Sequence, residues 1–461
     1  MNLFRRKSFE DTMAHSKHKP LKKTLGAMDL VLLGIGCTIG TGIFVLTGVA
    51  AAQHAGPAVS LSYVFAAIAC AFAGLAYTEL AAAMPVAGGA YTYSYSIVGE
   101  FVAWIVGCGL MLEYTVGAST VAAGWSGYFV GILKSGGIEL PISLTQVPSN
   151  GGIVNLPAML ISLFVGSLLI RGTKESVVLN RILVAVKIIV IFLFLIIATP
   201  HIDTAKWTND FMPFGLEGVL TGAATIFFAY IGFDAVATAA EETKNPNRDL
   251  PIGIIGSLVC CSLLYVAVSL ALTGITHYSE LGNAEPIAYA LRQNGSNLGS
   301  AIVATGAVAG MVAVLLVLMY GQSRIFFVMS RDKLIPGVFS KLHQKFHTPY
   351  ISCGIVTLSV ALISGFTPIT LLGHMTSFGT LFAFMIAAVS MMVFRIKRPD
   401  VERPFKCPYP FFVGTMAVLI CGFLVFKLLH VIAAAFFVWV ALAIVFYFAY
   451  SYRKSGLNNI K

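Results

Sequence analysis

The sequence predicts an all-α membrane protein in which twelve transmembrane helices form two inverted repeats of five, followed by two C-terminal helices. Of the 461 residues, 57% are apolar and 11% are charged, and the mean hydropathy is +0.85. An ordinary soluble domain carries about 25% charged residues. Apolar runs long enough to cross a bilayer recur along the whole chain, and the first and sixth of them are interrupted by glycine.

The apolar runs divide the chain into twelve expected spans. They cover residues 27–51, 57–81, 98–131, 153–170, 177–199, 216–241, 251–274, 298–328, 350–366, 371–394, 407–428 and 432–452. The third and eighth exceed what a bilayer needs, so we expect them to tilt or to extend beyond it. A basic tail, 1–26, precedes the first span, and a short tail, 453–461, follows the last.

The positive charges are distributed as membrane topology requires. An even number of spans puts both termini on one side of the membrane. If that side is the cytoplasm, 25 of the 30 Lys and Arg residues lie on cytoplasmic segments, and the exceptions are Lys134, Lys206, Arg292, Lys427 and the intramembrane Lys187. This positive-inside pattern predicts a multi-pass protein of the cell membrane with cytoplasmic termini. It also explains the basic tail as a topology signal with affinity for anionic lipid, so no nucleic-acid partner is expected.

The first span is weakened in its middle. Gly34–Phe44 reads GIGCTIGTGIF, with four glycines where a plain anchor has Leu, Ile and Val. Gly costs roughly 1 kcal/mol against Ala in a helix interior, and a freed backbone group in hydrocarbon costs several kcal/mol more. The sixth span has a second weak point, with Gly232 at its centre and Asp234 just after it.

The two weak points occupy corresponding positions of the two repeats. Five helices are an odd number, so two such units in series lie in the membrane with opposite orientation. The repeats cover 27–199 and 216–394, and 407–452 is expected to be a scaffold or an oligomer face. Interrupted segments at matching positions point to the binding site of a transporter. The alternative is that the glycines only allow close packing of helices.

A pair of broken helices suits one class of ligand. Each break leaves orphan carbonyls on one half-helix and orphan amides on the next. The amide end attracts anions and the carbonyl end attracts cations. A zwitterion whose carboxylate and ammonium groups are attached to one carbon therefore matches both helix ends. The expected substrate-binding residues are Thr38, Ile39, Gly40, Thr41, Gly42, Phe228, Ala229, Ile231 and Asp234. Asp234 either caps a helix terminus or adds a negative charge near the substrate path.

Two ionisable residues lie deep in the expected spans. Lys187 stands about ten residues into the fifth span, hence about 15 Å deep, where a lysine costs at least roughly 2.5–3.5 kcal/mol. Burial disfavours the charged form, so we expect Lys187 to exchange a proton during a transport cycle. The alternative is a permanently charged clamp on carbonyls of the first break. Glu113, in the third span, is either a second proton-exchanging group or a fixed brace.

No metal, cofactor or enzyme active site is expected. The eight cysteines lie in spans or at their ends in no metal-ligand spacing, and the nine histidines are scattered. No Walker-type loop or Ser/His/Asp grouping occurs. An ion channel would need repeated carbonyl or charged rings around a pore, which one asymmetric pair of breaks does not supply.

Several blocks of the chain resemble the amino acid–polyamine–organocation superfamily, closest to bacterial relatives of the cationic amino acid transporters. They are GIGCTIGTGIFVLTG, AGPAVSLSYVFA, PVAGGAYTYSYSIVGE with MLEY, MPFGLEGVLTGAATIFFAYIGFDAVATAAEETKNPNRDLPIGI and SRIFFVMSRDKLIP. The resemblance covers essentially the whole chain. It implies a LeuT-like five-plus-five inverted repeat with two trailing helices, and proton-coupled uptake of amino acids.

The resemblance also implies roles for single residues. Thr41 and Gly42 would meet the substrate carboxylate, and backbone carbonyls of the sixth-span residues would meet its amino group, with Phe228 as a gate. Lys187 corresponds to the place where sodium-coupled relatives of the fold bind an ion, which argues against sodium dependence. Glu113 matches a third-span glutamate of the subgroup.

The predicted function is therefore proton-coupled symport of L-amino acids by alternating access. An exchanger without proton coupling is the first alternative, and a non-transporting sensor or a channel is a more remote one. The eighth span is wholly apolar from Met311 to Leu318, where it borders the expected side-chain pocket. This favours small or medium neutral substrates over cationic ones. The preferred amino acid, the oligomeric state and any small accessory subunit are left open.

Overall fold

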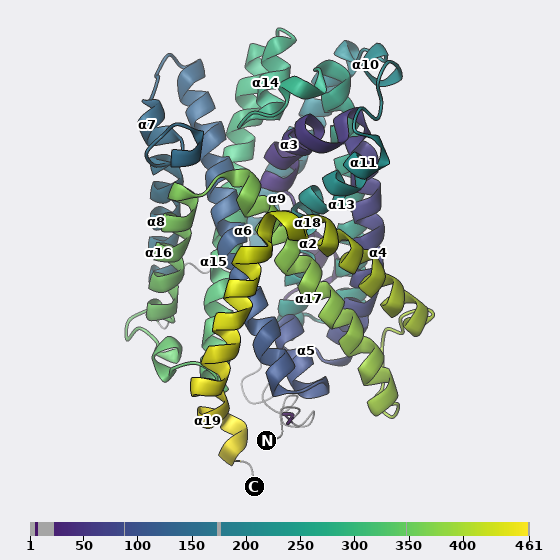
Figure 1. Cartoon of the computed structure of the whole chain (residues 1–461), viewed down its shortest axis with the longest axis vertical. Coiled ribbons are helices and arrows are strands. Elements are labelled where there is room, and N and C mark those ends of the chain that lie inside the picture. Colours follow the sequence, from purple (N-terminus) through teal and green to yellow (C-terminus); the bar gives the residue numbers. More distant parts are fainter. Residues whose placement is uncertain (1–4, 8–22, 87, 173–176, 347, 460–461) are drawn as a thin grey trace.

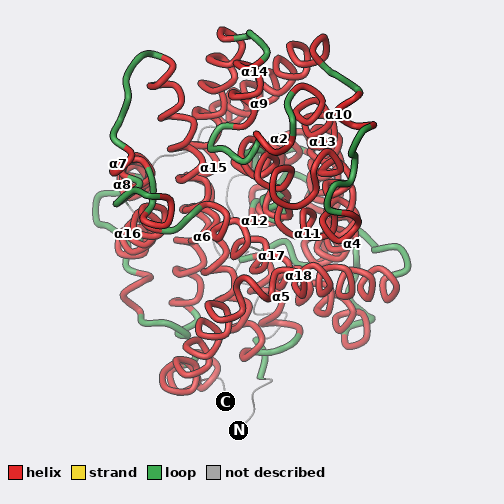
Figure 2. The backbone as a smooth tube through the Cα atoms, turned by 45° about the horizontal axis from the view of Figure 1, so that its top comes forward, coloured by secondary structure: helices red, strands yellow, loops and turns green. Residues whose placement is uncertain are grey.

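The computed structural model describes residues 5–7, 23–86, 88–172, 177–346 and 348–459, and helices and loops account for these ranges (Figure 2), with one isolated β-bridge between Leu25 and Thr243. The expected tails at 1–26 and 453–461 lie partly outside the described residues.

The longer helices form the body of the molecule (Figure 1). In chain order they are α2 (Ala27–Thr38), α4 (Val59–Ala83), α5 (Gly89–Ile97), α6 (Glu100–Ser135), α8 (Leu156–Arg171), α9 (Val177–Ala198), α11 (Gly215–Ile226), α13 (Pro246–Ile275), α14 (Pro286–Gln293), α15 (Asn297–Arg331), α16 (Tyr350–Phe366), α17 (Ile369–Lys397) and α18 (Pro410–Phe446).

Short helical segments connect them. The α-helical ones are α3 (Thr47–Ala50), α7 (Ile142–Thr145), α10 (Ala205–Thr208), α12 (Ala235–Thr238) and α19 (Tyr452–Lys454). Three segments are π-helical, namely η1 (Gly42–Leu46), η2 (Ala51–Ala55) and η10 (Tyr447–Ser451). The others are 3₁₀-helical, namely η3 (Gly56–Ala58), η4 (Pro148–Asn150), η5 (Thr199–His201), η6 (Phe227–Tyr230), η7 (Ala240–Glu242), η8 (Tyr278–Glu280), η9 (Gly337–Ser340) and η11 (Gly456–Asn459).

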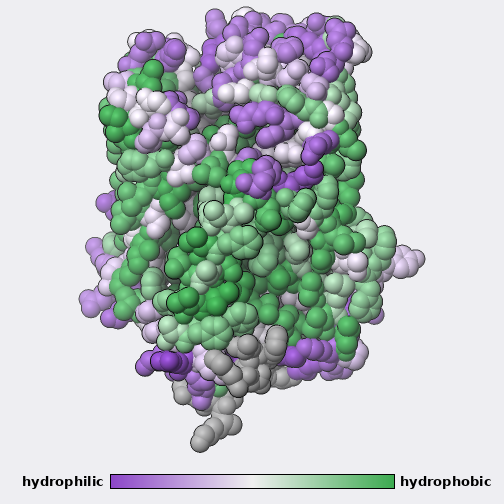
Figure 3. Space-filling view, viewed as in Figure 1, coloured by the Kyte–Doolittle hydropathy of each residue, from purple (hydrophilic) through white to green (hydrophobic). Residues whose placement is uncertain are grey.

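The molecule has the surface of a membrane protein. Figure 3 shows apolar surface around its middle and polar surface gathered towards its two ends. In the described part of the chain, seven apolar helical stretches are long enough to cross a membrane, and four shorter apolar helices accompany them. Eight expected spans, the second to fifth and the seventh to tenth, each match one helix to within five residues. The chain is a multi-pass membrane protein.

Both ends of the described chain lie at one end of the molecule (Figure 1), which we call the terminal face. The opposite end, which carries α10 and α14, is the distal face. Between the two faces, α6 packs on α15 and α17, while α13 packs on α4 and α2. α13 and α15 pack on α2 of the first interrupted span, and α4 and α17 pack on α11 and η6 of the sixth.

The last two expected spans, 407–428 and 432–452, are joined without a break in the helix. One helix, α18, runs through the residues where a connection was expected. The sequence contains neither Gly nor Pro between Gly422 and Phe446. Without such a residue, nothing in the local chemistry ends the backbone hydrogen bonding of the helix.

α18 nevertheless changes direction. Early in the helix, Gly422 lies against Met385 in the middle of α17. Near its end, the carbonyl of Ala443 accepts a hydrogen bond from Trp104, 2.8 Å away, at the terminal-face end of α6. The helix therefore rises along α17 and returns towards the terminal face (Figure 1). Its two arms correspond to the two apolar runs read from the sequence.

A buried ion-pair cluster joins α4 to the segment between α17 and α18 at the terminal face. Glu79 is fully buried, and its carboxylate accepts two hydrogen bonds from Arg395, at 2.7 and 2.6 Å. It also accepts the Cys407 amide at 2.8 Å and lies 3.4 Å from Arg403. One buried carboxylate thus pairs with two guanidinium groups, those of the half-buried Arg395 and the buried Arg403.

We predict that Glu79→Gln lowers the free energy of unfolding by about 3–5 kcal/mol, because removing one partner of a buried pair leaves the other charge uncompensated. The measurement is thermal unfolding of the purified protein in detergent. Glu217→Gln is the matched control, because Glu217 is 82% exposed and pairs with Lys427 at the surface, where ion pairs contribute little. Equal melting temperatures for the two variants would contradict the prediction.

Candidate functional site

The two interrupted helices touch at their breaks. α2 ends at Thr38, Ile39 is extended, and η1 begins at Gly42. A Cβ atom built on Gly42 would lie only 2.4 Å from the Cα of Ala229 in η6. The absence of a side chain at position 42 therefore brings the backbones of the two breaks together.

The second break also depends on a glycine. After η6, Ile231 is extended and Gly232 has a φ of +125°, a region that L-residues rarely adopt. A Cβ atom on Gly232 would lie 2.7 Å from the carbonyl carbon of Cys37. Gly232 thus opens its own helix and admits the end of α2 beside it.

A small cavity of about 10 Å³ lies between the breaks, roughly the space for one water molecule. Its lining residues are Cys37, Thr38, Gly40, Thr41, Gly42, Val121, Phe228, Ile231, Val314 and Leu318. Six of the predicted substrate-binding residues are among them. Ile39, Ala229 and Asp234 are buried beside the cavity but do not line it. An amino acid can enter only if the surrounding helices move.

Two threonine hydroxyls at the first break are poorly satisfied. Thr41 donates to the thioether sulfur of Met311, 3.2 Å away, and a thioether is a weak acceptor. The buried hydroxyl of Thr38 has no hydrogen-bond partner among the described residues. A carboxylate oxygen is a stronger acceptor than sulfur, so it would displace Met311 from the Thr41 hydroxyl.

Tyr265 of α13 joins the two breaks, a role that no pattern in the sequence predicts. Its hydroxyl lies 2.9 Å from the carbonyl oxygen of Thr38 and 2.8 Å from that of Ala229. Both carbonyls belong to helix ends that have lost their intrahelical partners. The tyrosine is fully buried, so it holds the breaks at a fixed separation.

Other neighbouring helices satisfy the remaining freed backbone groups. Ser377 of α17 accepts the amide of Phe228 at 2.9 Å, and Tyr128 of α6 donates to the carbonyl of Phe44 at 2.8 Å. Such partners are what allow an irregular backbone inside a membrane protein. The breaks can be recognised in the sequence by their glycines. The partners Ser377 and Tyr128 cannot be recognised in this way, because they lie far from the breaks along the chain.

We predict that Tyr265→Phe lowers transport about tenfold to a hundredfold, since it removes the single hydroxyl donor that two buried carbonyls share. Initial uptake rates into liposomes measure the effect. Tyr289→Phe is the control, because the Tyr289 hydroxyl pairs with Glu280 at the exposed distal surface. If both variants transported at the wild-type rate, Tyr265 would not hold the breaks.

Lys187 lies beside the first break but does not line the cavity. It is fully buried, and its Nζ donates to the carbonyl oxygen of Gly36 at 2.6 Å. In an unbroken helix this carbonyl would accept the amide of residue 40. The ammonium group therefore replaces the lost backbone donor at the negative end of the α2 dipole. Its aliphatic stem packs tightly against Gly310 of α15.

Glu113 and Asp234 lie together on the terminal-face side of the cavity. Glu113 is 2% exposed, interacts with Asp234 and Thr380, and its Oε2 has no hydrogen-bond partner in the described chain. Asp234 accepts the amide of Gly232 at 3.2 Å and faces Tyr114 at 3.5 Å. Asp234 stands at the N-cap position of α12, but its side chain makes no capping hydrogen bond to that helix. The carboxylate instead binds the backbone within the break itself.

A larger cavity, about 510 Å³, opens at the distal face. Gln53, Asn155 and Asn283 are among its lining residues, and none of the lining residues is charged. The side chain of Thr41 packs against Gly124 of α6. Gly124 directly follows Ala123 and lies about one turn before Gly127, and both of these residues line the distal cavity. Thr41 thus stands between the distal cavity and the small one.

Comparison with known proteins gives consistent matches along the whole chain. The model of the amino acid permease family matches residues 25–452. The branched-chain amino acid permease BcaP of Bacillus subtilis (strain 168) is 45% identical over 464 residues, which cover 99% of each chain. The methylthioribose transporter of the same organism is 42% identical over 460 residues, 99% of this chain and 100% of the relative. Cationic amino acid transporter 4, vacuolar, of Arabidopsis thaliana is 37% identical over 409 residues, 87% of this chain and 68% of the relative.

Proposed function

We propose, starting from the fact that this chain belongs to the amino acid permease family, that it carries L-amino acids across the cell membrane by alternating access. Its relatives are transporters and not enzymes. The observation that carries the proposal is the cavity between the two breaks. Amide and carbonyl ends of broken helices meet there, and they match the two charges of a zwitterion.

We propose twelve spans with cytoplasmic termini, in two inverted repeats over 27–199 and 216–394. The breaks at matching positions of the two repeats support this arrangement. α18 would cross the membrane twice through its two arms. The terminal face would be cytoplasmic, because 25 of the 30 Lys and Arg residues lie on segments assigned to that side.

The proposed substrates are neutral amino acids with small or medium apolar side chains. The side-chain end of the cavity is formed by Val121, Val314 and Leu318, and no charged residue lines it. A cationic side chain would be buried there without a partner, which is costly. The relatives are named for different substrates, namely branched-chain amino acids, methylthioribose and cationic amino acids, so the apolar lining is the better guide.

Lys187 is proposed to couple a proton to this cycle. The charged amine binds the Gly36 carbonyl and so stabilises the broken form of the first span, with its amides free for a carboxylate. A neutral amine binds the same carbonyl less strongly. Loss of the proton to the cytoplasmic side would then release the end of α2, allow α2 to swing and complete the cycle. Glu113 is proposed as the second proton-exchanging group, beside Asp234.

The test is uptake of labelled isoleucine, alanine and lysine into sodium-free liposomes containing the purified protein, with and without an inward proton gradient. We expect accumulation of isoleucine or alanine above equilibrium only with the gradient, and little lysine. Unlabelled methylthioribose serves as a competitor, since one relative is named for it. Uptake that ignores the gradient but requires internal amino acid would make the protein an exchanger. Binding without uptake would make it a sensor, and an ionic current without saturation would make it a channel.

A further inference from the structure

We propose that the N-terminal segment Arg5–Lys7 is a strap that fastens the two chain ends together and holds the terminal face closed. The proposal rests on the proposed function in one respect, because it assumes that the terminal face opens during the cycle. The contacts of the strap themselves are independent of the transport site.

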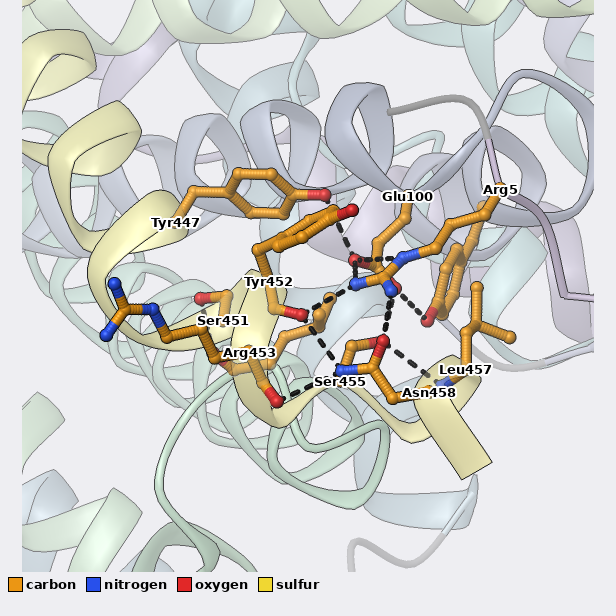
Figure 4. A network of polar contacts seen from close by, with 11 residues as sticks. Arg5, Glu100, Tyr447, Ser451, Tyr452, Arg453, Ser455, Leu457 and Asn458 are labelled. Atoms are coloured by element: carbon orange, nitrogen blue, oxygen red, sulfur yellow. Dashed lines mark hydrogen bonds and ion pairs between the residues drawn. The ribbon is translucent and has the colours of Figure 1, made fainter. Parts of the chain in front are cut away.

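The strap is seated on a buried carboxylate. Glu100, the first residue of α6, is fully buried. Its Oε1 accepts hydrogen bonds from Arg5 at 3.0 and 2.6 Å and from Tyr447 at 3.0 Å. Its Oε2 accepts from Tyr95 at 3.1 Å and from Ser455. Figure 4 shows Arg5 and Tyr447 converging on Glu100. With five hydrogen bonds to its carboxylate, Glu100 is a specific binding site for the guanidinium group of Arg5.

Arg5 also holds the C-terminal segment. It donates to the carbonyl of Tyr452 at 2.9 Å and to the side chain of Asn458, and its guanidinium group lies over the Tyr452 ring at 4.4 Å. The Arg5 carbonyl accepts the amide of Glu100 at 2.8 Å. One residue near the N-terminus therefore connects the start of α6 to the last described residues of the chain (Figure 4).

A second strap residue binds a second acidic group. Lys7 pairs with Asp332 at 3.0 Å, just after α15, and Asp332 also accepts the Tyr91 hydroxyl of α5 at 2.9 Å. The amide of Gly456 binds the Asp332 carbonyl at 3.1 Å. The strap thus connects α5, α6, α15 and the C-terminal segment.

The next part of the chain that the structure describes begins at residue 23, just before α2. Close to the start of α2, the amides of Thr24 and Leu25 bind the carbonyl of Glu242, at 3.0 and 3.1 Å. The amide of Lys244 binds the carbonyl of Leu25 at 2.9 Å. The N-terminal segment is therefore held to the body both before α2 and at Arg5–Lys7. Since α2 is the helix that must swing to open the terminal face, these contacts resist the opening.

The test compares two neighbouring arginines. Arg5→Ala removes the group that binds Glu100, and Arg6→Ala removes an adjacent exposed arginine of the same charge. The reporter is Cys37, which lines the small cavity and is 5% exposed, so it should become accessible from the terminal face only when that face opens. A membrane-impermeant maleimide is added on the terminal-face side, and mass spectrometry measures the modification of Cys37. Cys421, fully buried in α18, is the internal reference.

We expect Arg5→Ala to raise the labelling rate of Cys37 by about tenfold, the effect of losing a strong charge-assisted interaction. Labelling of Cys421 should stay unchanged, Arg6→Ala should behave as the wild type, and Arg5→Lys should restore part of the protection. Unchanged Cys37 labelling in Arg5→Ala would overturn the proposal. An equal rise at Cys37 and Cys421 would also overturn it, because it would indicate general loosening of the fold.

The readout separates this proposal from the proposed function, because labelling requires no transport. If the protein moved no amino acid but Arg5→Ala still raised the labelling rate of Cys37, the strap would be supported and the transport proposal refuted. If the protein transported amino acids but Arg5→Ala left Cys37 protected, the transport proposal would stand and the strap would be refuted. Glu100→Gln, if it folds, should reproduce the effect of Arg5→Ala from the other side of the contact.

Discussion

Substituting Gly42 by alanine is expected to reduce the initial rate of amino acid uptake by at least about a hundredfold. The added Cβ atom would lie 2.4 Å from the Cα and 2.5 Å from the Cβ of Ala229, well inside the ordinary contact distance. The overlap involves backbone, so the two breaks must separate. Overpacking of this kind costs about 1–3 kcal/mol, and displacement of binding groups by about 1 Å can reduce a rate by about a hundredfold.

The measurement is uptake into liposomes, together with thermal unfolding to verify that the variant is folded. Gly354→Ala is the matched control, because Gly354 also lies in a helix, α16, but a Cβ atom there would meet nothing within 4 Å. We expect the control to transport like the wild type. If Gly42→Ala transported equally well, the contact between the two breaks would not form the substrate site.

Substituting Lys187 by methionine is expected to abolish accumulation driven by a proton gradient. Methionine has a similar length and can fill the space beside Gly310, but it cannot donate to the Gly36 carbonyl. That carbonyl would remain unsatisfied in the membrane interior, and no group on the fifth span could take up or release a proton. We expect accumulation above equilibrium to fall to background.

A second assay distinguishes coupling from a purely static role. Exchange of labelled for unlabelled amino acid across the liposome membrane requires no net proton movement. If Lys187 couples the proton, Lys187→Met should lose gradient-driven accumulation and keep part of its exchange activity. Loss of both activities in a folded variant would favour the clamp interpretation, and unchanged gradient-driven uptake would refute the coupling role.

The site and the strap have one physical feature in common. In each, a charged side chain replaces or completes hydrogen bonding that the local backbone cannot provide. Lys187 binds a carbonyl freed by the break in the first span, and Arg5 neutralises a carboxylate buried at the start of α6. Lys187 and the Glu100 carboxylate are both fully buried, so losing the partner of either charge is costly. Such contacts are suited to hold one conformation until a defined event releases it.

The sequence by itself determined the class of protein and the two interruptions. Bilayer thickness fixes the length of an apolar run, so hydropathy predicted most helix bounds to within a few residues. Glycine lowers the stability of a helix through its own backbone, so Gly42 and Gly232 could be recognised locally. The sequence also predicted the bond between Lys187 and the first break, as the alternative to proton exchange, because a buried lysine needs a nearby acceptor.

Only the tertiary structure decided how the freed groups are satisfied. Tyr265 bridges carbonyls of both breaks, and its partners lie 227 and 36 residues away in the chain. Arg5 and the C-terminal segment meet on Glu100 although Arg5 and Tyr452 are 447 residues apart. The turn of α18 likewise depends on its packing on α17 and α6, since neither Gly nor Pro lies between Gly422 and Phe446. Composition and local spacing show that a segment has backbone or charged groups that require a hydrogen-bonding partner. They do not specify which distant side chain is that partner, because this depends on how the helices pack.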